Sequence, residues 1–530
     1  MNHIELFAGC GGLSLGLDEA GFELILANEL SPMAAETFAY NFYGEDLEEL
    51  ANQNQMPAHT FWINSKNDSL KPRLRENPFE FPAYGTEGYS DLTEDWEVLY
   101  GNLVVGSIIE LNRLLDENPI LVDHLRNTFG HNGGLDLVSG GPPCQGFSMA
   151  GKREKNNDKN TLPWEFAKFV EHTQPKIALL ENVTGILRPF KDDNGNRFYA
   201  WYEVAKVFAS IGYVPLCLHV NARQAGVAQN RPRFIMIAVK YDHLIDLNEV
   251  LDEASLSLFE QPLAFYNHVQ SMDVNQYANL PIRLLDYIDA TKPAGLQQFV
   301  NTFLHPLVEN ENEVSVQAAL DDLKIHNPTQ PSTFIQQLNQ TFTRLAEQPA
   351  TLNHDFRNNS PLVKRRFRLY QVLQQVDDRR VNNAVFSILK GHTDVLPVDI
   401  WETLSEFEYL HENQELHTFN EQHDFEHYLQ AHPTKKQTQK ALIANSPAPA
   451  ALSIPDDACH YDEHELRVLT VREMARIQSF PDNFVFRSKI TTGGQMRKFE
   501  VPQYTQVGNA VPPILGFKLG QAIAALLPDA

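Results

Sequence analysis

Short apolar runs that end in polar or glycine-rich segments recur through the first 240 residues. Runs of this kind lie at 4–7, 24–29, 135–138, 175–183 and 234–238. Continuous apolar runs of this length are typical of buried strands in a parallel sheet. We therefore expect an α/β fold in which several strand ends carry polar groups, because ligands bind at the carboxyl ends of the strands in open α/β sheets.

One of these strands leads directly into the segment Gly141-Pro142-Pro143-Cys144-Gln145-Gly146-Phe147-Ser148. The two prolines stiffen the loop and so present the thiol of Cys144 at the end of the strand. A thiol becomes a nucleophile once it loses its proton. A cysteine is more often a small buried hydrophobe, and this loop alone leaves both interpretations open.

A glycine-rich turn connects the first strand to a helix-like pattern and contains Phe7-Ala8-Gly9-Cys10-Gly11-Gly12-Leu13. Glycines allow a backbone to approach a ligand closely, although such a turn by itself is a weak indicator of a cofactor site. The next strand ends in Glu29, where a carboxylate commonly holds a ribose hydroxyl. Together they predict a cofactor of the adenosine type.

Two further strands carry charged groups near their ends. Glu181 ends the run at 175–183, and Arg231 and Arg233 directly precede the run at 234–238. Each group alone is equally consistent with a solvated strand end. A thiol, a carboxylate and an arginine pair at the strand ends of one sheet indicate a shared reactive site.

The sequence blocks FAGCGG, NE, GGPPCQGFS, ENV and QNRPR follow one another, and LTVREMARIQSFPDNF (469–484) and QVGNAVPP (506–513) complete the series. In this order the chain resembles the DNA cytosine-5 methyltransferases, over about residues 1–240 and 465–530. The pairing of Pro-Cys-Gln with Glu-Asn-Val is highly specific. The resemblance implies an α/β fold with a Rossmann-like S-adenosylmethionine-dependent methyltransferase domain and a large inserted target-recognition domain.

The resemblance also implies catalytic roles. Cys144 would add as a thiolate to C6 of cytosine, and Glu181 would hydrogen-bond N3 and the exocyclic amine. Arg233 would hold the carbonyl at O2, with Arg231 supporting the same pocket or a phosphate. The target base must leave the duplex to be reached, and residues 148–160 are expected to close over the DNA.

The predicted cofactor is S-adenosyl-L-methionine. In the loop at 148–160, Lys159 stands where the family carries an arginine, which keeps the charge and loses the bidentate fork. Asn102 stands where the family carries an aspartate and could accept a hydrogen bond from the adenine amine. The residues expected to bind the cofactor are Phe7, Ala8, Gly9, Cys10, Gly11, Gly12, Leu13, Glu29, Asn102, Pro142, Asn509, Ala510 and Val511.

The expected domains are a catalytic domain at 1–240 and 465–530, and a target-recognition domain at 241–464. A surface insertion of unknown role is expected at 44–97, which is rich in Asn, Pro and acidic residues. Within the large insertion, apolar residues recur at helical spacing at 315–324, 333–347, 362–375 and 398–409. Residues 351–380 and 432–446 are candidates for DNA contact, with helix packing as the alternative.

The end of the chain returns to the catalytic domain. Residues 446–450, Ser-Pro-Ala-Pro-Ala, have the composition of a linker. Thr470 and Glu473 have the spacing of a capping box and predict the start of a helix. The last helix, after the block at 506–513, is expected to complete the cofactor domain.

The composition restricts the setting of the protein. The 530 residues include 43% hydrophobic residues, enough for more than one core. The four cysteines show no metal-binding spacing, so a reducing compartment and no metal are expected. No apolar run has membrane-spanning length, and we expect a cytoplasmic protein without a membrane partner.

Double-stranded DNA is the expected partner, although the net charge of −25 opposes binding to a polyanion at long range. Basic residues at 152–159, 364–368 and 435–436 are candidate local patches. A monomer is expected, and a cognate restriction endonuclease encoded nearby is a candidate partner. The alternatives are an RNA cytosine-5 methyltransferase and a catalytically idle DNA-binding module. Intact Cys144, Glu181 and Arg233 count against the idle module.

Overall fold

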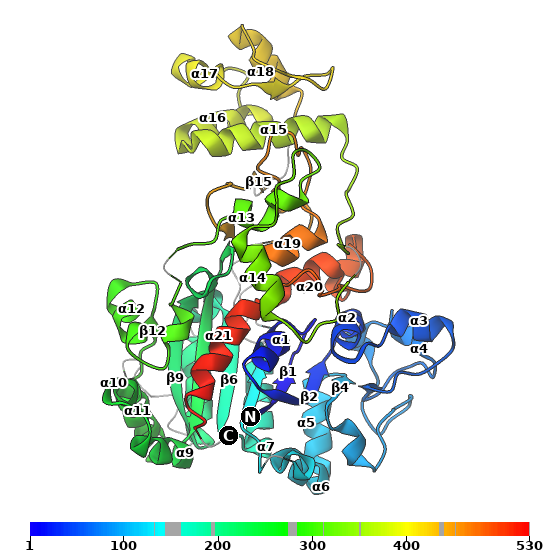
Figure 1. Cartoon of the computed structure of the whole chain (residues 1–530), viewed down its shortest axis with the longest axis vertical. Coiled ribbons are helices and arrows are strands. Elements are labelled where there is room, and N and C mark those ends of the chain that lie inside the picture. The colour runs from blue at the N-terminus through cyan, green and yellow to red at the C-terminus, as the bar shows by residue number, and fades with distance from the viewer. Residues whose placement is uncertain are drawn as a thin grey trace.

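The computed structural model describes residues 1–131, 133–143, 161–191, 197–273, 284–310, 312–348, 351–433, 439–450 and 452–528. A nine-stranded sheet forms its centre (Figure 1). In spatial order the strands are β12 (Ile288–Asp289), β9 (Tyr213–Asn221), β11 (Pro232–Lys240), β6 (Ile177–Val183), β5 (Leu137–Gly140), β1 (Asn2–Leu6), β2 (Glu23–Glu29), β4 (Asn102–Val105) and β3 (Thr60–Trp62). The predicted strands and the α/β fold are confirmed.

The strand directions define one edge of this sheet. Neighbouring strands from β6 to β3 run parallel, and β11 runs antiparallel to both β6 and β9. From β1 the chain builds outward through β2 and β4 and then returns to β5 on the other side of β1. The connections diverge at this point, and a ligand binds at the carboxyl edge there in open α/β sheets.

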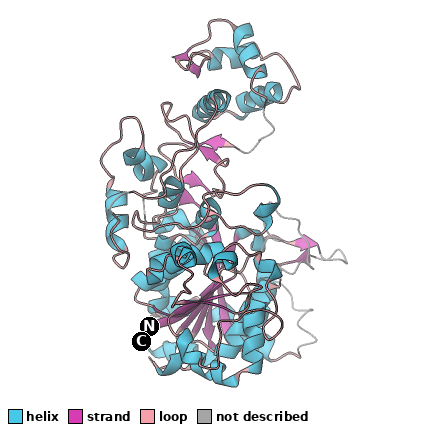
Figure 2. Ribbon diagram, turned by 90° about the vertical axis from the view of Figure 1, so that its right-hand side faces the viewer, coloured by secondary structure: helices cyan, strands magenta, loops and turns pink. Residues whose placement is uncertain are grey.

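Helices cover both faces of the sheet (Figure 2). Side chains of Ile4, Val138 and Leu180 belong to one core, and those of Leu137 and Leu179 belong to the core on the opposite face. Burial on both faces explains why the strands have continuous apolar sequences. The first core is closed by α5 (Ile108–Glu117), α6 (Pro119–Arg126), α7 (Leu162–Thr173), α8 (Ala200–Ser210) and α11 (Glu260–Gln270).

The final helix, α21 (Pro513–Ala524), lies along the first helix, α1 (Gly12–Glu19), on one face of the sheet. A Cβ atom at Gly16 would lie 2.4 Å from the carbonyl oxygen of Pro513, and one at Gly520 would lie 2.4 Å from Cβ of Ala20. The two helices therefore pack closely only because glycines stand at these positions. The last helix thus packs against the first helix, as expected for a segment that belongs to the same domain.

The segment at 44–97 extends the sheet. Its strand β3 pairs with β4, and it also contains α3 (Leu47–Asn52) and α4 (Leu70–Arg73). Arg73 is buried and lies 2.7 Å from the carboxylate of Asp91. The segment was expected to be a surface excursion, because its strand of only three residues gives no long apolar run in the sequence.

The first part of the segment at 241–464 packs on the nine-stranded sheet. Strand β12 pairs with β9, and side chains from Leu244 to Leu307 share a core with β9, β11 and α21. This part contains α9 (Tyr241–Asp246), α10 (Glu253–Ser257), α11 and α12 (Pro293–Val300). The hydrophobic core on this face of the sheet therefore extends past the expected boundary at residue 240. Helical periodicity predicts a helix without identifying the surface that it covers.

Further along the chain, α13 (Val316–Leu320) and α14 (Thr333–Thr341) pack in one core with α2 (Pro32–Tyr43) and α19 (Val471–Ile477). The predicted helices at 315–324 and 333–347 are shorter in the structure than in the prediction. Helix α19 begins at Thr470, whose side chain accepts from the Glu473 amide while the Glu473 carboxylate accepts from Thr470. The predicted capping box is confirmed.

Residues 361–433 form an outer module with a hydrophobic core of its own. It contains α15 (Pro361–Val376), α16 (Arg379–Leu389), α17 (Val398–Leu404), α18 (Gln422–Gln430) and the hairpin of β13 (Tyr409–Leu410) and β14 (Leu416–His417). Figure 1 shows α15 and α16 on the side of the catalytic domain and α17 and α18 at the distal end. Within the described residues, every helix is too short or too polar to cross a membrane.

Candidate active site

Glu181 and Arg233 form a buried ion pair on two neighbouring strands. Nε of Arg233 lies 2.6 Å from Oε1 of Glu181, and the two side chains are only 9% and 11% exposed. The antiparallel register places Arg233 beside Val183 and Glu181 beside Ile235. The structure therefore brings together two of the predicted catalytic residues.

The pair places a hydrogen-bond acceptor and several hydrogen-bond donors together in a site that is largely shielded from solvent. Burial lowers the pKa of the Arg233 guanidinium, and the Glu181 carboxylate opposes this shift. A buried charge of this kind persists when it is paired and hydrogen-bonded. Such a pair can recognise the polar edge of a heterocycle, because a carboxyl group binds ring and exocyclic nitrogens and a guanidinium donates to a carbonyl.

The loop after β5 rests on this pair. A Cβ atom at Gly141 would lie 2.9 Å from Oε2 of Glu181. Nδ2 of Asn182 donates to the carbonyl oxygen of Pro142 at 3.0 Å. The described part of the Pro-Pro loop thus lies beside Glu181, as the strand ends predicted. Cys144 itself, and the loop at 148–160 with Lys159, lie outside the described residues.

Three other cysteines are described, and all are buried free thiols: Cys10, Cys217 and Cys459. Burial raises the pKa of each thiol far above its usual range. A thiol held in this way supplies almost no thiolate at neutral pH. These three side chains are therefore unsuited to nucleophilic attack.

The glycine-rich turn is braced by Glu29. Phe7, Gly9 and Gly11 have φ angles of 56°, 56° and 94°, in the left-handed region. Oε2 of Glu29 accepts from the Gly9 amide at 2.8 Å, and Oε1 accepts from the Ser31 amide at 2.7 Å. Burial raises the pKa of Glu29, and these amides oppose the shift. The carboxylate thus fixes the turn at the carboxyl end of β2.

The turn also meets the segment that follows α20 (Gln503–Asn509). A Cβ atom at Gly12 would lie 2.3 Å from the carbonyl oxygen of Val511 and 3.4 Å from Cβ of Ala510. A Cβ atom at Gly9 would meet no atom within 4 Å, so this side of the turn has room for a ligand. Residues from both ends of the chain therefore form one cradle.

The predicted cofactor residues differ in their exposure. Asn509 is exposed, whereas Ala8, Cys10 and Leu13 are buried in hydrophobic cores. Sγ of Cys10 lies 3.7 Å from the carbonyl oxygen of Gln506. These buried side chains pack on the side of the cradle away from the ligand, so only the backbone of these residues could face a ligand.

Asn102 is not part of this cradle. It begins β4 and pairs in register with Leu26, whereas Glu29 pairs with Val105 at the other end of the strand. Its Oδ1 lies 2.8 Å from Nδ1 of His59, and its Nδ2 donates to Val98. In a parallel sheet the cofactor edge is the carboxyl end, so Asn102 stands at the wrong end of β4.

At the cofactor edge, β4 is followed by Gly106 and Ser107. The Gly106 amide donates to the carbonyl oxygen of Glu29 at 2.9 Å, and Nδ2 of Asn28 donates to the carbonyl of Gly106 at 3.1 Å. Sequence reasoning missed these residues. The apolar run at 103–105 directly before them was the available signal.

Arg231 contacts the C-terminal segment. Its Nη2 donates to the carbonyl oxygens of Gly508 at 2.8 Å and Ala510 at 3.0 Å. The side chain is buried, and burial lowers the pKa of the guanidinium well below its usual value. The structure thus places Arg233, and not Arg231, against Glu181.

The sequence also did not predict a buried carboxyl group in β1, the strand that leads into the glycine-rich turn. Glu5 in β1 accepts a hydrogen bond from the Ser14 hydroxyl of α1. Burial raises the pKa of Glu5 to about 8, so the group is mostly protonated at neutral pH. An acidic residue inside an apolar strand was the signal for it.

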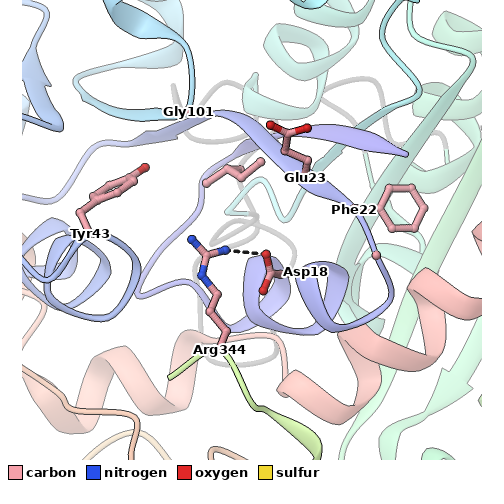
Figure 3. Close-up of a pocket in the computed structure, with 8 residues that line it drawn as sticks. Asp18, Phe22, Glu23, Tyr43, Gly101 and Arg344 are labelled. Atoms are coloured by element: carbon pink, nitrogen blue, oxygen red, sulfur yellow. Dashed lines mark hydrogen bonds and ion pairs between the residues drawn. The ribbon is translucent and has the colours of Figure 1, made fainter. Parts of the chain in front are cut away.

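A pocket of about 410 Å³ lies elsewhere, where β2 and β4 begin (Figure 3). Asp18 pairs there with Arg344, and the Glu23 carboxylate accepts from the Tyr100 hydroxyl. Its charged side chains are thus already paired, and the pocket lies at the end of the strands opposite Glu29. Among the described residues, no group of three or more His, Cys, Asp or Glu could hold a metal ion.

Comparison with known proteins identifies the family of this chain. The family of C-5 cytosine-specific DNA methylases matches residues 1–64 and 122–525. The type II methyltransferase M.DdeI of Desulfomicrobium norvegicum is 24% identical over 525 residues, covering 99% of this chain and 88% of the relative. M.AgeI of Thalassovita gelatinovora is 26% identical over 541 residues, covering 99% of each chain. The chain belongs to the C-5 cytosine-specific DNA methylase family.

Proposed function

We propose that this protein transfers a methyl group to C5 of a cytosine in a specific sequence of double-stranded DNA. The buried Glu181–Arg233 pair under the loop at Gly141–Pro143 is the observation that carries the proposal. The names of the relatives support a type II modification enzyme. A cognate restriction endonuclease, a cytoplasmic location and a monomeric state remain part of the proposal.

The proposed reaction begins when the Cys144 thiolate adds to C6 of the flipped cytosine. As the S–C6 bond forms, the C5–C6 π electrons make C5 nucleophilic. The Glu181 carboxyl group hydrogen-bonds N3 and the exocyclic amine and neutralises the charge that develops at N3. Arg233 donates to O2 and holds the ring in place. S-adenosylmethionine, when bound, supplies the methyl group that C5 accepts.

The reaction ends when a base removes the C5 proton, the C5–C6 double bond forms again and the thiolate leaves. Water is the candidate for this base. Cys144 is assigned as the nucleophile from its sequence position, and the burial of Cys10, Cys217 and Cys459 supports the assignment. The pKa of each of these three thiols is raised by burial, so none is activated for attack.

The cradle fits S-adenosylmethionine. Its open side at Gly9 gives the backbone of the turn room to approach a ligand, and Glu29 stands where a carboxylate accepts from ribose hydroxyls. The carbonyl of Val511 lies directly over Gly12 and forms a wall of the cradle. Pro142 and Asn509 would contact the ligand from the two sides. Gly106 and Ser107 lie at the carboxyl end of β4, the position beside the cofactor that was expected for Asn102.

The outer module is the proposed DNA-reading part, and its charges are divided between two layers. Residues 361–390, with α15 and α16, contain two acidic residues and the basic residues Lys364, Arg365, Arg366, Arg368, Arg379, Arg380 and Lys390. Residues 391–433, with α17 and α18, contain ten acidic residues and no Lys or Arg. Arg365, Arg368 and Arg380 pair with Glu412, Glu463 and Asp399, so the exposed Arg379 and Lys390 are the basic residues that would contact DNA. Since α15 and α16 lie on the side of the catalytic domain (Figure 1), DNA can bind there despite the net charge of −25.

The test is transfer of labelled methyl from S-adenosylmethionine to unmodified duplex DNA, followed by bisulfite sequencing. Incorporation at cytosine C5 in one short sequence context is expected. The alternative of an RNA substrate predicts label in RNA and none in DNA. Cofactor binding without transfer to either nucleic acid would favour the idle DNA-binding module and contradict the proposal.

A further inference from the structure

The backbone of Arg231 is fixed by hydrogen bonds, and its side chain is buried. Its amide donates to Oδ1 of Asn221 at 3.0 Å, and its carbonyl accepts from the Ala222 amide at 3.0 Å. The residue is 3% exposed. It lies at the break between β10 (Gln229–Asn230) and β11, so its direction is set by two strands of the catalytic domain.

The guanidinium binds the end of helix α20. Its Nη2 donates to Gly508 at 2.8 Å and to Ala510 at 3.0 Å. The last carbonyls of a helix lack partners within the helix and carry the negative end of its dipole. A guanidinium is suited to this place, because one of its nitrogens satisfies both carbonyls and a second remains available for another acceptor.

The same guanidinium also reaches the chain that returns from the outer module. Nη1 of Arg231 donates to the carbonyl of Ala450 at 3.4 Å. Just before it, β16 (Ala448–Pro449) pairs with β10. The return segment and the end of α20 are also in close contact, because a Cβ atom at Gly508 would lie 2.5 Å from Cα of Ser453.

These contacts connect three parts of the proposed enzyme. Ala510 and Val511 lie against Gly12 of the glycine-rich turn. Arg233, two residues after Arg231, is paired with Glu181. The wall of the cofactor cradle and the return segment therefore meet at the side chain of Arg231, and the base pocket begins two residues further along the chain.

We propose that Arg231 is a positioning residue that holds residues 508–511 against the glycine-rich turn and thereby sets the affinity for the cofactor. The inference rests on the proposed function in that S-adenosylmethionine occupies the cradle. Nη2 of Arg231 is directed to backbone carbonyls, Nη1 donates to Ala450 and to Oε1 of Gln229, and the recognition of O2 is left to Arg233. Lysine, with one charged nitrogen and no fork, replaces only part of this arrangement.

The test compares Arg231→Met, Arg231→Lys and a matched control, Arg223→Met, whose side chain is 37% exposed and pairs with Glu313 on the surface. The affinity for S-adenosylhomocysteine is measured by calorimetry without DNA. Arg231→Met is expected to bind at least about tenfold more weakly, because it removes two charge-assisted hydrogen bonds to the wall. Arg231→Lys should lie between it and the wild type, and Arg223→Met should bind within about twofold of the wild type.

Kinetics separate this role from a direct contact with the base. A positioning role predicts that KM for S-adenosylmethionine rises more than kcat falls, and that Arg231→Lys restores part of the change. An unchanged affinity for S-adenosylhomocysteine together with a large fall in kcat would overturn the proposal and place Arg231 in the base pocket. The binding arm uses no nucleic acid, so a failure of the proposed DNA methylation would be recognised separately in the wild type.

Hydrogen exchange keeps the test decisive if Arg231→Met does not fold. In Arg231→Lys, the amides of residues 503–511 are expected to exchange faster than in the wild type, while those of β1 and β2 exchange as before. Equal protection of residues 503–511 in the two proteins would contradict the proposed anchoring.

Discussion

At the scale of single residues, the buried pair of Glu181 and Arg233 is the centre of the proposed chemistry. Removing one partner leaves the other buried charge without compensation, which lowers the free energy of unfolding by about 3–5 kcal/mol. The identities of both residues could be predicted from the sequence, because each lies at the end of an apolar strand. Their direct contact could not, since it depends on the antiparallel register of β11 with β6.

Glu181→Gln is expected to lower kcat by at least about 100-fold, because an amide cannot neutralise charge at N3 by moving a proton. DNA and cofactor affinities should change little. The measurement is single-turnover methyl transfer with saturating DNA. Glu171→Gln, an exposed change on α7, serves as the control and should keep wild-type rates. A Glu181→Gln rate within a few-fold of wild type would exclude Glu181 from the chemistry.

Glu5 gives a prediction for the pH dependence of stability. Its pKa is raised by burial from 4.5 to about 8 in the folded protein. The folded state therefore holds this proton more tightly than the unfolded chain does. The contribution of the protonated Glu5 to the free energy of unfolding is fully present below pH 4.5 and is lost as the pH rises through about 8. Glu5→Gln keeps a neutral side chain and should remove this loss. Thermal unfolding at pH 6 and pH 9, compared between the two proteins, measures the difference, and parallel declines in Tm would contradict it.

At the scale of elements, the polar groups that cap helices and strands organise the site. Glu473 closes the first turn of α19 and also accepts two hydrogen bonds from Arg467, both at 2.8 Å. The capping role could be predicted from the spacing of Thr470 and Glu473. The partner Arg467 could not, because nothing in the local sequence shows that the two side chains are buried together.

Glu473→Gln is expected to lower the free energy of unfolding by about 1.5–3 kcal/mol, because Arg467 would lose its charge-assisted hydrogen bonds to Glu473 and keep only Glu465, at 2.6 Å, as a buried carboxylate partner. Glu402→Gln, on the exposed side of α17, should change it by less than about 0.5 kcal/mol. Denaturant unfolding measures both. Equal stability of the Glu473 variant and the wild type would mean that the ion pair of Glu473 and Arg467 contributes nothing to α19.

The misplaced elements have a common physical cause. The segment from Leu244 to Leu307 was expected in the recognition domain, yet it packs on the catalytic sheet. Asn102 was expected at the cofactor, yet it begins its strand. Periodicity identifies a helix or strand, but the surface that it covers and the end of the strand that a residue occupies depend on long-range packing.

At the scale of the whole molecule, charge is separated within the outer module. The total of −25 predicts repulsion from DNA, and this total does not reveal that the basic residues gather on α15 and α16. The helix at 362–375 was predicted from its periodicity and is confirmed as α15. Its position toward the catalytic domain (Figure 1) emerges only when the chain is folded.

Replacing Arg379 and Lys390 together by glutamine is expected to weaken DNA binding and to lower the slope of log Kd against log salt by about 1 for each phosphate that the variant no longer neutralises. The matched control replaces Lys71 and Lys168, on α4 and α7, and changes the net charge equally. DNA affinities between 50 and 200 mM salt, about the range in which counterion release dominates, measure the slope. Equal slopes for both variants would place the DNA on another surface.

The most direct measurement of the central claim uses duplex DNA in which cytosines carry fluorine at C5. The C5 substituent that must leave as a proton is then absent, so addition of the thiolate and methyl transfer should end in a stable covalent complex of protein and DNA. With S-adenosylmethionine present, the wild type is predicted to form this complex through Cys144, and Cys144→Ala is predicted to form none. An adduct on a different residue, or methyl transfer to unmodified DNA by Cys144→Ala, would contradict the proposed chemistry.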